Sequence, residues 1–212
     1  MRGLDEILVN AIAQTVKKEI NSKEFDGIEH QLQDQGMQVT DMFYKFPEMK
    51  KSLSNFTNEL KIIEDRVLRN FLTVEQGSKP SEIWLAVRNP HLTEIILKSF
   101  ADEEKKAIMN LITDNPETIP KILELCKIPN TSGYRKMNQL IDDKMVVTTG
   151  LAETFEGKRA ILYKSLIQKL QIIVNGNEII ARIRVNQKTL DSSEIVRTIT
   201  EINQNKAKTA AN

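Results

Sequence analysis

A run of hydroxyl, basic and amide side chains follows Pro129 at positions that one helix would present to solvent. The residues on this run that could contact DNA are Thr131, Ser132, Tyr134, Arg135, Lys136, Asn138 and Gln139. Arginine and lysine bind phosphates or guanine edges, and asparagine and glutamine bind adenine. The alternative is an ordinary solvated helix face, with Ser132 and Thr131 acting only as helix caps and Tyr134 packing inward.

The elements that would position this run are three helices and a hairpin. Helices are predicted over residues 102–112, 118–127 and from about 130 to 143, with Ile128-Pro129 as the break before the third. An inward stripe on the third helix is predicted from Tyr134, Met137, Leu140 and Ile141. Asn130 or Thr131 is the expected cap of this helix.

Two β-rich runs follow the third helix. They cover residues 145–149 and 160–166 and are separated by a polar segment with Gly150 and Gly157. Lys158 and Arg159 lie beside the second glycine, where they could contact the DNA backbone or minor groove. A helix, a turn, a second helix and a basic hairpin together predict a winged helix-turn-helix. In this motif the second helix enters the major groove of DNA.

The run 129–147 resembles the recognition helix and first wing strand of MarR- and ArsR-type prokaryotic regulators, and residues 157–163 resemble their returning wing strand. These matches cover about a quarter of the chain. Lys144 departs from the pattern, because such sequences commonly end the helix with glycine. The resemblance implies a sequence-specific transcriptional regulator that binds double-stranded DNA as a homodimer.

The N-terminal region, residues 1–76, is predicted to be a helical output or dimerisation domain. Apolar residues recur at helical spacing from Leu4 to Val16, and a shorter helix over 26–35 is expected to stop at Gly36. The opening Leu-Asp-Glu-Ile-Leu, followed by Ala-Ile-Ala, resembles small all-helical output domains attached to archaeal regulators.

A heptad stripe follows Pro47. Its members are Met49, Leu53, Phe56, Leu60, Ile63 and Val67. Apolar residues at alternating spacings of four and three suit the core face of one long helix within the domain, and they also suit a dimer seam. Both interpretations stay open on the sequence alone.

The rest of the chain is divided by composition. Residues 77–81 are a predicted linker, rich in glycine, serine and proline, and residues 82–189 are the predicted winged-helix domain. A helix capped by Ser81 is expected over Ile83 to Val87. An extra hairpin is expected around Asn175-Gly176. Residues 190–212 are predicted to be a weak helix and a disordered tail. The expected fold class is mainly α with a small β component.

Composition limits the functions that the chain can perform. The 212 residues are 28% charged and 40% hydrophobic, with a net charge of +1, so any basic footprint has to be local. Residues 117–169 carry nine Lys or Arg against six Asp or Glu, a net of +3, whereas residues 1–80 carry eleven against thirteen, a net of −2. No apolar run reaches the roughly 18 residues of a membrane span, and the N-terminus lacks a signal-peptide pattern, so a cytoplasmic protein is expected.

Catalytic and metal chemistry has little support in the sequence. The single Cys126 lies among apolar residues and is expected to be a core side chain, with a redox role as the alternative. His30 and His91 have no cysteine companions, and the sequence contains neither a phosphate loop nor a catalytic triad. We therefore expect no enzyme, no cofactor and no metal site. A DNA-binding regulator is the first hypothesis, and a protein-interaction module that uses the winged helix as a docking platform is the second.

Overall fold

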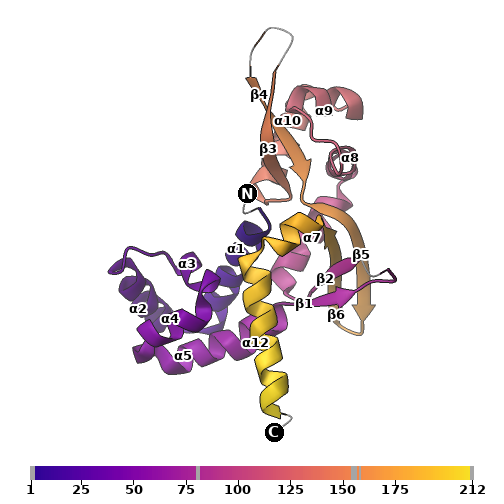
Figure 1. Cartoon of the computed structure of the whole chain (residues 1–212). Helices are drawn as coiled ribbons and strands as arrows, with labels where there is room; N and C mark the ends of the chain where they lie inside the picture. Colours follow the sequence, from indigo (N-terminus) through magenta and orange to yellow (C-terminus); the bar gives the residue numbers. More distant parts are fainter. Residues whose placement is uncertain (1–2, 80–81, 154–156, 158, 211–212) are drawn as a thin grey trace.

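The computed structural model describes residues 3–79, 82–153, 157 and 159–210, with the last six of these described by their backbone alone. The fold is mainly helical with a small antiparallel β component, as predicted. Figure 1 shows the N-terminal helices at one end, helices α8 to α10 with the hairpin β3–β4 at the other, and a sheet beside α7.

The N-terminal region is a set of helices packed around α1. Its elements are α1 (Gly3–Glu19), α2 (Ser22–Gln33), α3 (Val39–Tyr44), α4 (Phe46–Ser52), the 3-10 turn η1 (Ser54–Phe56), α5 (Thr57–Ile62), the π-helix η2 (Ile63–Leu68) and α6 (Arg69–Phe71). The predicted stripe of α1 is buried, and Leu8 and Ile12 are completely covered. Asn21 caps α2 by accepting from the Glu24 amide, and Gly36 has a φ of +71°, which suits the end of that segment.

The heptad stripe does not form a dimer seam. Leu53, Leu60, Ile63 and Val67 are at most 2% exposed, because they pack into the core of their own chain. The segment is also not one helix, since it passes through α4, η1, α5 and η2. The intradomain core that the sequence left open is therefore the arrangement observed, and the proposal of a Met49 to Val67 seam is corrected.

A four-stranded antiparallel sheet contains β1 (Leu72–Gln76), β2 (Ile83–Val87), β5 (Ile167–Asn175) and β6 (Glu178–Val185) in the order β1-β2-β6-β5. The helix predicted over Ile83 to Val87 is wrong. This run is a strand whose last four residues are buried. Because both faces of such a strand are covered, its residues are apolar throughout, and the sequence has no periodicity that distinguishes it from a buried helix.

The predicted linker connects two paired strands. Leu72 lies opposite Val87 and Gln76 lies opposite Ile83, so the strands on either side of the predicted linker pair with each other. Pro80 and Ser81 of the predicted linker lie outside the described residues. A cut at this position would leave β1 on one side and its partner β2 on the other.

The central segment supplies the elements of the candidate site. They are α7 (Pro90–Ala101), α8 (Glu103–Leu111), α9 (Ile119–Cys126), α10 (Asn130–Asp142), β3 (Val146–Glu153) and β4 (Arg159–Ser165). Asn89 caps α7 and Asp102 caps α8, each accepting from backbone amides of the first turn. Strands β3 and β4 form a separate two-stranded sheet.

The C-terminal segment returns to the N-terminal helices. The predicted Asn-Gly hairpin is confirmed, with Gly176 at φ +58° between β5 and β6. Helices α11 (Gln187–Asp191) and α12 (Glu194–Ala210) follow, so the tail predicted to be disordered is helical as far as Ala210. Buried Asp5 on α1 accepts from the Ser193 hydroxyl and from the Glu194 amide, the latter at 3.1 Å, and so holds the start of α12.

Candidate nucleic-acid interface

Helix α10 is held against α9 by a sharp turn and a close contact. Lys127 ends α9 at φ +56°, and the Ile128 amide donates to the Leu123 carbonyl at 3.0 Å. A Cβ on Gly133 would lie 2.4 Å from Leu123 Cδ2, so the absence of a side chain lets the two helices approach. The buried residues of α10 are Gly133, Met137 and Leu140.

The β3–β4 hairpin is joined to the helices by backbone hydrogen bonds. The Glu117 amide donates to the Tyr163 carbonyl at 3.1 Å, and the Tyr163 amide donates back at 2.8 Å. The Ser165 amide donates to the Ile112 carbonyl at 3.0 Å. The hairpin is therefore fixed relative to α8 and to the start of α9.

The exposed face of α10 contains most of the predicted DNA-contact residues. Thr131, Tyr134, Arg135, Asn138 and Gln139 are all exposed. No hydrogen bond or ion pair to the Arg135 side chain occurs within the described part of the chain, so its guanidinium is free to bind another molecule. Tyr134 is 43% exposed, which corrects the predicted inward stripe, because Gly133 takes the inward position instead.

Lys136 does not belong to this exposed face. Its Nζ donates to both carboxylate oxygens of Asp102, at 2.6 and 2.5 Å, and lies 3.1 Å from Glu104. Its side chain is only 14% exposed. The prediction of a DNA contact at Lys136 is therefore corrected: the residue ties α10 to the first turn of α8.

Ser132 and the helix start also differ from expectation. Helix α10 begins at Asn130, after Pro129 as the N-cap residue, and no side chain caps it, so the predicted capping by Asn130 or Thr131 is wrong. Ser132 is partly buried, and its hydroxyl donates to the Pro129 carbonyl at 3.2 Å. At the other end, Lys144 takes φ +57°, the conformation for which glycine is common, and its amide donates to the Ile141 carbonyl.

The hairpin tip is only partly described. Arg159 is exposed at the start of β4, whereas Lys158 lies outside the described residues. The hairpin also presents an apolar cross-strand pair, since Leu151 lies opposite Ile161 and both are exposed. Sequence reasoning missed this pair, because Leu151 stands between Gly150 and Ala152 and Ile161 between Ala160 and Leu162, so no alternation with polar residues marked it.

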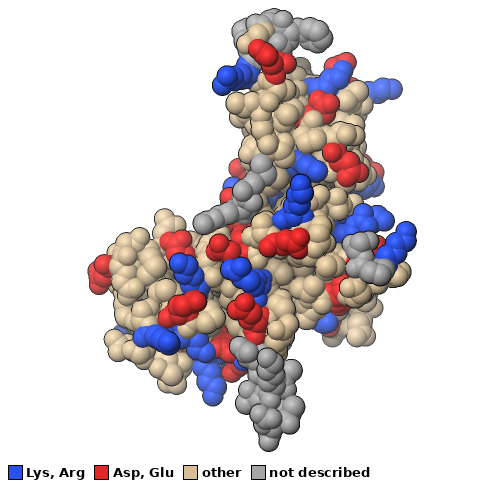
Figure 2. Space-filling model, viewed as in Figure 1, with Lys and Arg blue, Asp and Glu red and all other residues tan. Residues whose placement is uncertain are grey.

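The charge around α10 is mixed. Figure 2 shows Lys and Arg side chains interspersed with Asp and Glu over the visible face of the molecule. Lys127, before α10, is exposed and was not among the predicted contacts, whereas Asp142 adds a negative charge near the end of the helix. A DNA contact at this face would therefore depend on few cations.

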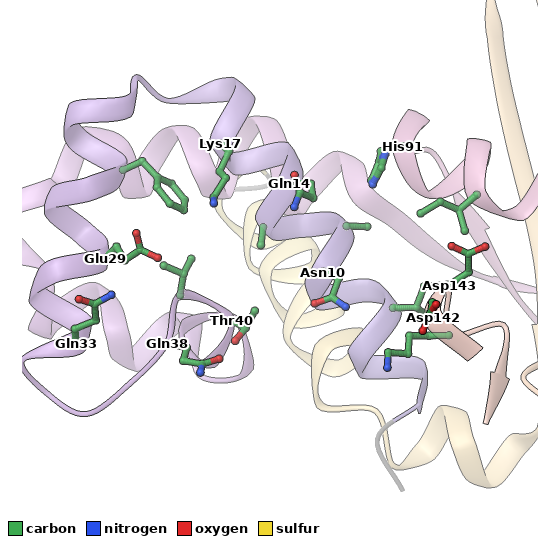
Figure 3. A pocket seen from close by; sticks show the side chains of 17 residues that line it. Asn10, Gln14, Lys17, Glu29, Gln33, Gln38, Thr40, His91, Asp142 and Asp143 are labelled. Carbon is green, nitrogen blue, oxygen red and sulfur yellow. The ribbon is translucent and has the colours of Figure 1, made fainter. Parts of the chain in front are cut away.

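A cleft of about 680 Å³, lined by both polar and apolar side chains, lies between the N-terminal helices and the C-terminal end of α10. Figure 3 shows Asn10 and Gln14 of α1, Gln38 before α3, His91 of α7 and Asp142 and Asp143 around it. Amides and carboxylates suit hydrogen bonding to a polar solute. A solute in this cleft would contact both α1 and the end of α10.

Other candidate chemistry is limited. Burial raises the pKa of the Cys126 thiol, which disfavours the reactive thiolate. Among the residues that the structure describes, no group of three His, Cys, Asp or Glu side chains could hold a metal ion. In the same residues, no helix is long and apolar enough to cross a bilayer.

Comparison with known proteins adds no relative: no family model, curated protein or solved structure matches this chain.

The Lys136 contact leads to a stability prediction. The hydrogen bond from Lys136 holds the pKa of Asp102 below its ordinary value of 3.8, and the same contact holds the pKa of Lys136 above 10.5. We expect Lys136→Met to lower the free energy of unfolding by about 1–2 kcal/mol at neutral pH, because the charge-assisted hydrogen bonds are lost.

The pH dependence of that loss has a defined sign. The stabilisation that depends on ionised Asp102 is present above the pKa that this group has in the unfolded chain, and it is lost as pH falls through the folded-state pKa. The stabilisation that depends on charged Lys136 is lost as pH rises through the folded-state pKa of the lysine. Urea denaturation should therefore show parent and variant converging at acidic and at alkaline pH. Lys98→Met is the matched control, since the Lys98 side chain is 74% exposed in its pair with Glu94. A difference that is unchanged across pH would contradict the assignment.

Proposed function

We propose that this chain is a DNA-binding regulator built on a winged helix, with α8, α9 and α10 as the three helices and β3–β4 as the wing. Helix α10 would lie in the major groove and the hairpin would contact the adjacent backbone. The observation that carries the proposal is the exposed face of α10, where Arg135, Asn138 and Gln139 are available while the neighbouring Lys136 is held by acids. This arrangement suits regulators of the MarR and ArsR type.

The proposal gives Arg135 a role in DNA binding and Lys136 a role in stability, and this difference can be tested. A bidentate arginine contact to guanine contributes about 1–3 kcal/mol, so Arg135→Ala should weaken binding to a selected duplex by about tenfold or more. It should leave the unfolding midpoint unchanged. Lys136→Met should do the opposite, with a lower midpoint and nearly unchanged affinity at a temperature where it is folded.

Affinity should be measured by fluorescence anisotropy, with a duplex recovered from genomic fragments and with a scrambled duplex of the same length. Binding should fall as salt rises from about 50 to 200 mM, because phosphate contacts release counterions. If Arg135→Ala binds both duplexes as the parent does, α10 does not read DNA and the proposal is rejected.

A second function is favoured by one observation. Leu125 on α9 and the cross-strand pair Leu151 and Ile161 on the hairpin are each about half exposed, and exposed apolar side chains are what a docking partner would cover. Under this alternative, the chain would bind a protein through these side chains. Binding that is insensitive to salt, and is lost in Leu151→Ser but retained in Arg135→Ala, would favour docking over DNA recognition.

A further inference from the structure

Strand β5 is an edge of the four-stranded sheet, and its outer half is exposed. It pairs with β6 on one side, and the sheet ends at its other side. Ile172 and Ile173 are each 41% exposed, and Val174 is 68% exposed. An edge strand presents unpaired backbone amide and carbonyl groups, so this strand offers both hydrogen-bonding groups and apolar side chains to another strand.

Strand β5 has few of the features, such as proline and charged side chains, that normally keep an edge strand from pairing with another strand. The strand contains no proline, and Lys169 is its only charged residue, next to the register shift between Ile167 and Lys169. The opposite edge, β1, contains Glu75, which pairs with Arg182 at 2.8 Å. Beyond Lys169, β5 therefore has none of the charges that normally prevent strand pairing.

We propose that β5 pairs antiparallel with β5 of a second copy of this chain, across a two-fold axis at Ile172. In this register Ile172 faces its own equivalent, and Leu170 faces Val174 of the second copy, twice by symmetry. Three apolar cross-strand contacts then form one continuous stripe on a single face of an eight-stranded sheet.

Charge supports this occupant and this register. Within one chain, Lys169 lies opposite Arg184 and Asn175 lies opposite Glu178. Pairing at Ile172 sets Lys169 opposite Asn175 of the second copy. Arg184 and Lys169 of one copy then lie side by side with Asn175 and Glu178 of the other, across four neighbouring strands. Arg184 and Glu178 already pair within their own chain, with Glu82 and Arg88, so Lys169 is the unpaired charge at each end of the interface among the described residues. It faces the neutral Asn175 of the second copy, and no like charges face each other.

Neighbouring registers are poorer. A two-fold axis at Gln171 would place Lys169 against Ile173 and pair two glutamines at the centre. An axis at Ile173 would also form three apolar contacts, but it would place Lys169 and Leu170 opposite Asn177 and Gly176 of the turn. The register at Ile172 pairs every β5 residue from Lys169 to Asn175 and keeps Lys169 beside a polar side chain.

The first experiment is a charge exchange at the axis, read by sedimentation of the full chain. The parent should have an apparent mass of twice the 24.2 kDa of one chain. Ile172→Lys alone and Ile172→Glu alone should each sediment as one chain, because equal charges would face each other. An equal mixture of the two variants should recover the dimer. Val74→Lys, at an equally exposed position on the β1 edge, is the matched control and should leave the dimer intact.

The second experiment tests the register in a Cys126→Ser background. Residues directly opposite in an antiparallel pair have Cα atoms about 4.5–5.5 Å apart, which a disulfide can span. Ile172→Cys should therefore crosslink on mild oxidation. Val174→Cys, although more exposed, should not, because its own equivalent lies four residues farther along the strand.

The two experiments have outcomes that would overturn the dimer and outcomes that would overturn only its register. A parent chain that sediments at one chain mass at every concentration, or an Ile172→Lys and Ile172→Glu mixture that stays monomeric, overturns the proposal. Crosslinking of Val174→Cys but not Ile172→Cys overturns the register. None of these measurements uses DNA or α10, so their failure leaves the proposed function to its own test.

Discussion

Truncation of Leu53 to alanine is expected to lower the free energy of unfolding by about 3 kcal/mol, without changing the association state. Leu53 is completely buried between the N-terminal helices. Removal of its isobutyl group therefore loses burial and leaves a cavity that neighbouring residues fill only in part. Urea denaturation gives the free energy, and sedimentation gives the mass of the folded species.

The control for this substitution is Leu125→Ala on α9. Leu125 is 49% exposed, so the same chemical change should cost less than about 0.5 kcal/mol. A dimer seam would behave differently, because Leu53→Ala would then shift the monomer–dimer equilibrium with a modest effect on the monomer. Dissociation of the parent dimer by Leu53→Ala, with unchanged monomer stability, would restore the seam interpretation.

Several local signals in the sequence predicted helix starts, breaks and turns correctly. Asp102 caps α8 where the acidic run begins, Pro129 marks the break before α10, and Asn-Gly forms the β5–β6 turn. Each of these depends on residues that lie within a few positions of one another. The effect of a proline or of an Asn-Gly pair can therefore be read without knowing the rest of the fold, whereas the cap of α10 predicted at Asn130 or Thr131 could not.

Contacts between distant residues could not be read in this way. Lys136 looked like its neighbour Arg135 in the sequence, and only the position of Asp102, 34 residues earlier, makes one a tie between helices and leaves the other free. Asp5 looked like a first-turn acid of α1, yet it is buried against Ser193, 188 residues away. Spacing identifies a helix face but does not say what covers it.

The dimer-seam interpretation of the heptad stripe and the helix predicted at β2 were wrong for a related reason. The 4-3 spacing after Met49 is compatible with a seam, a core face or a broken helix, and the π-helix at Ile63–Leu68 changes the register that the spacing assumed. Ile83–Val87 is apolar throughout because both its faces are covered, so it lacks the alternation of a strand. Tertiary packing decided both cases.

Gly133 is the position where the placement of α10 is most sensitive to substitution. Its missing side chain sets the approach of α10 to α9, and a Cβ there would lie 2.4 Å from Leu123 Cδ2. Leu123 is itself 1% exposed, so it can move only by displacing other core residues. We expect Gly133→Val to lower the free energy of unfolding by about 2–3 kcal/mol, because overpacking exceeds the small gain in helix propensity.

Gly150→Val is the matched control, since no atom lies within 4 Å of a Cβ at that position on β3. A valine on a strand should leave stability unchanged or raise it slightly, because valine favours strands more than glycine does. Gly133→Val also pushes α10 away from α9. If α10 binds DNA as proposed, the folded fraction of this variant should bind it more weakly than the parent does, whereas Gly150→Val should leave the position of α10 unchanged. Equal stability of the two variants would mean that α9 and α10 are not in close contact, and the exposed face of α10 would then have to be placed again.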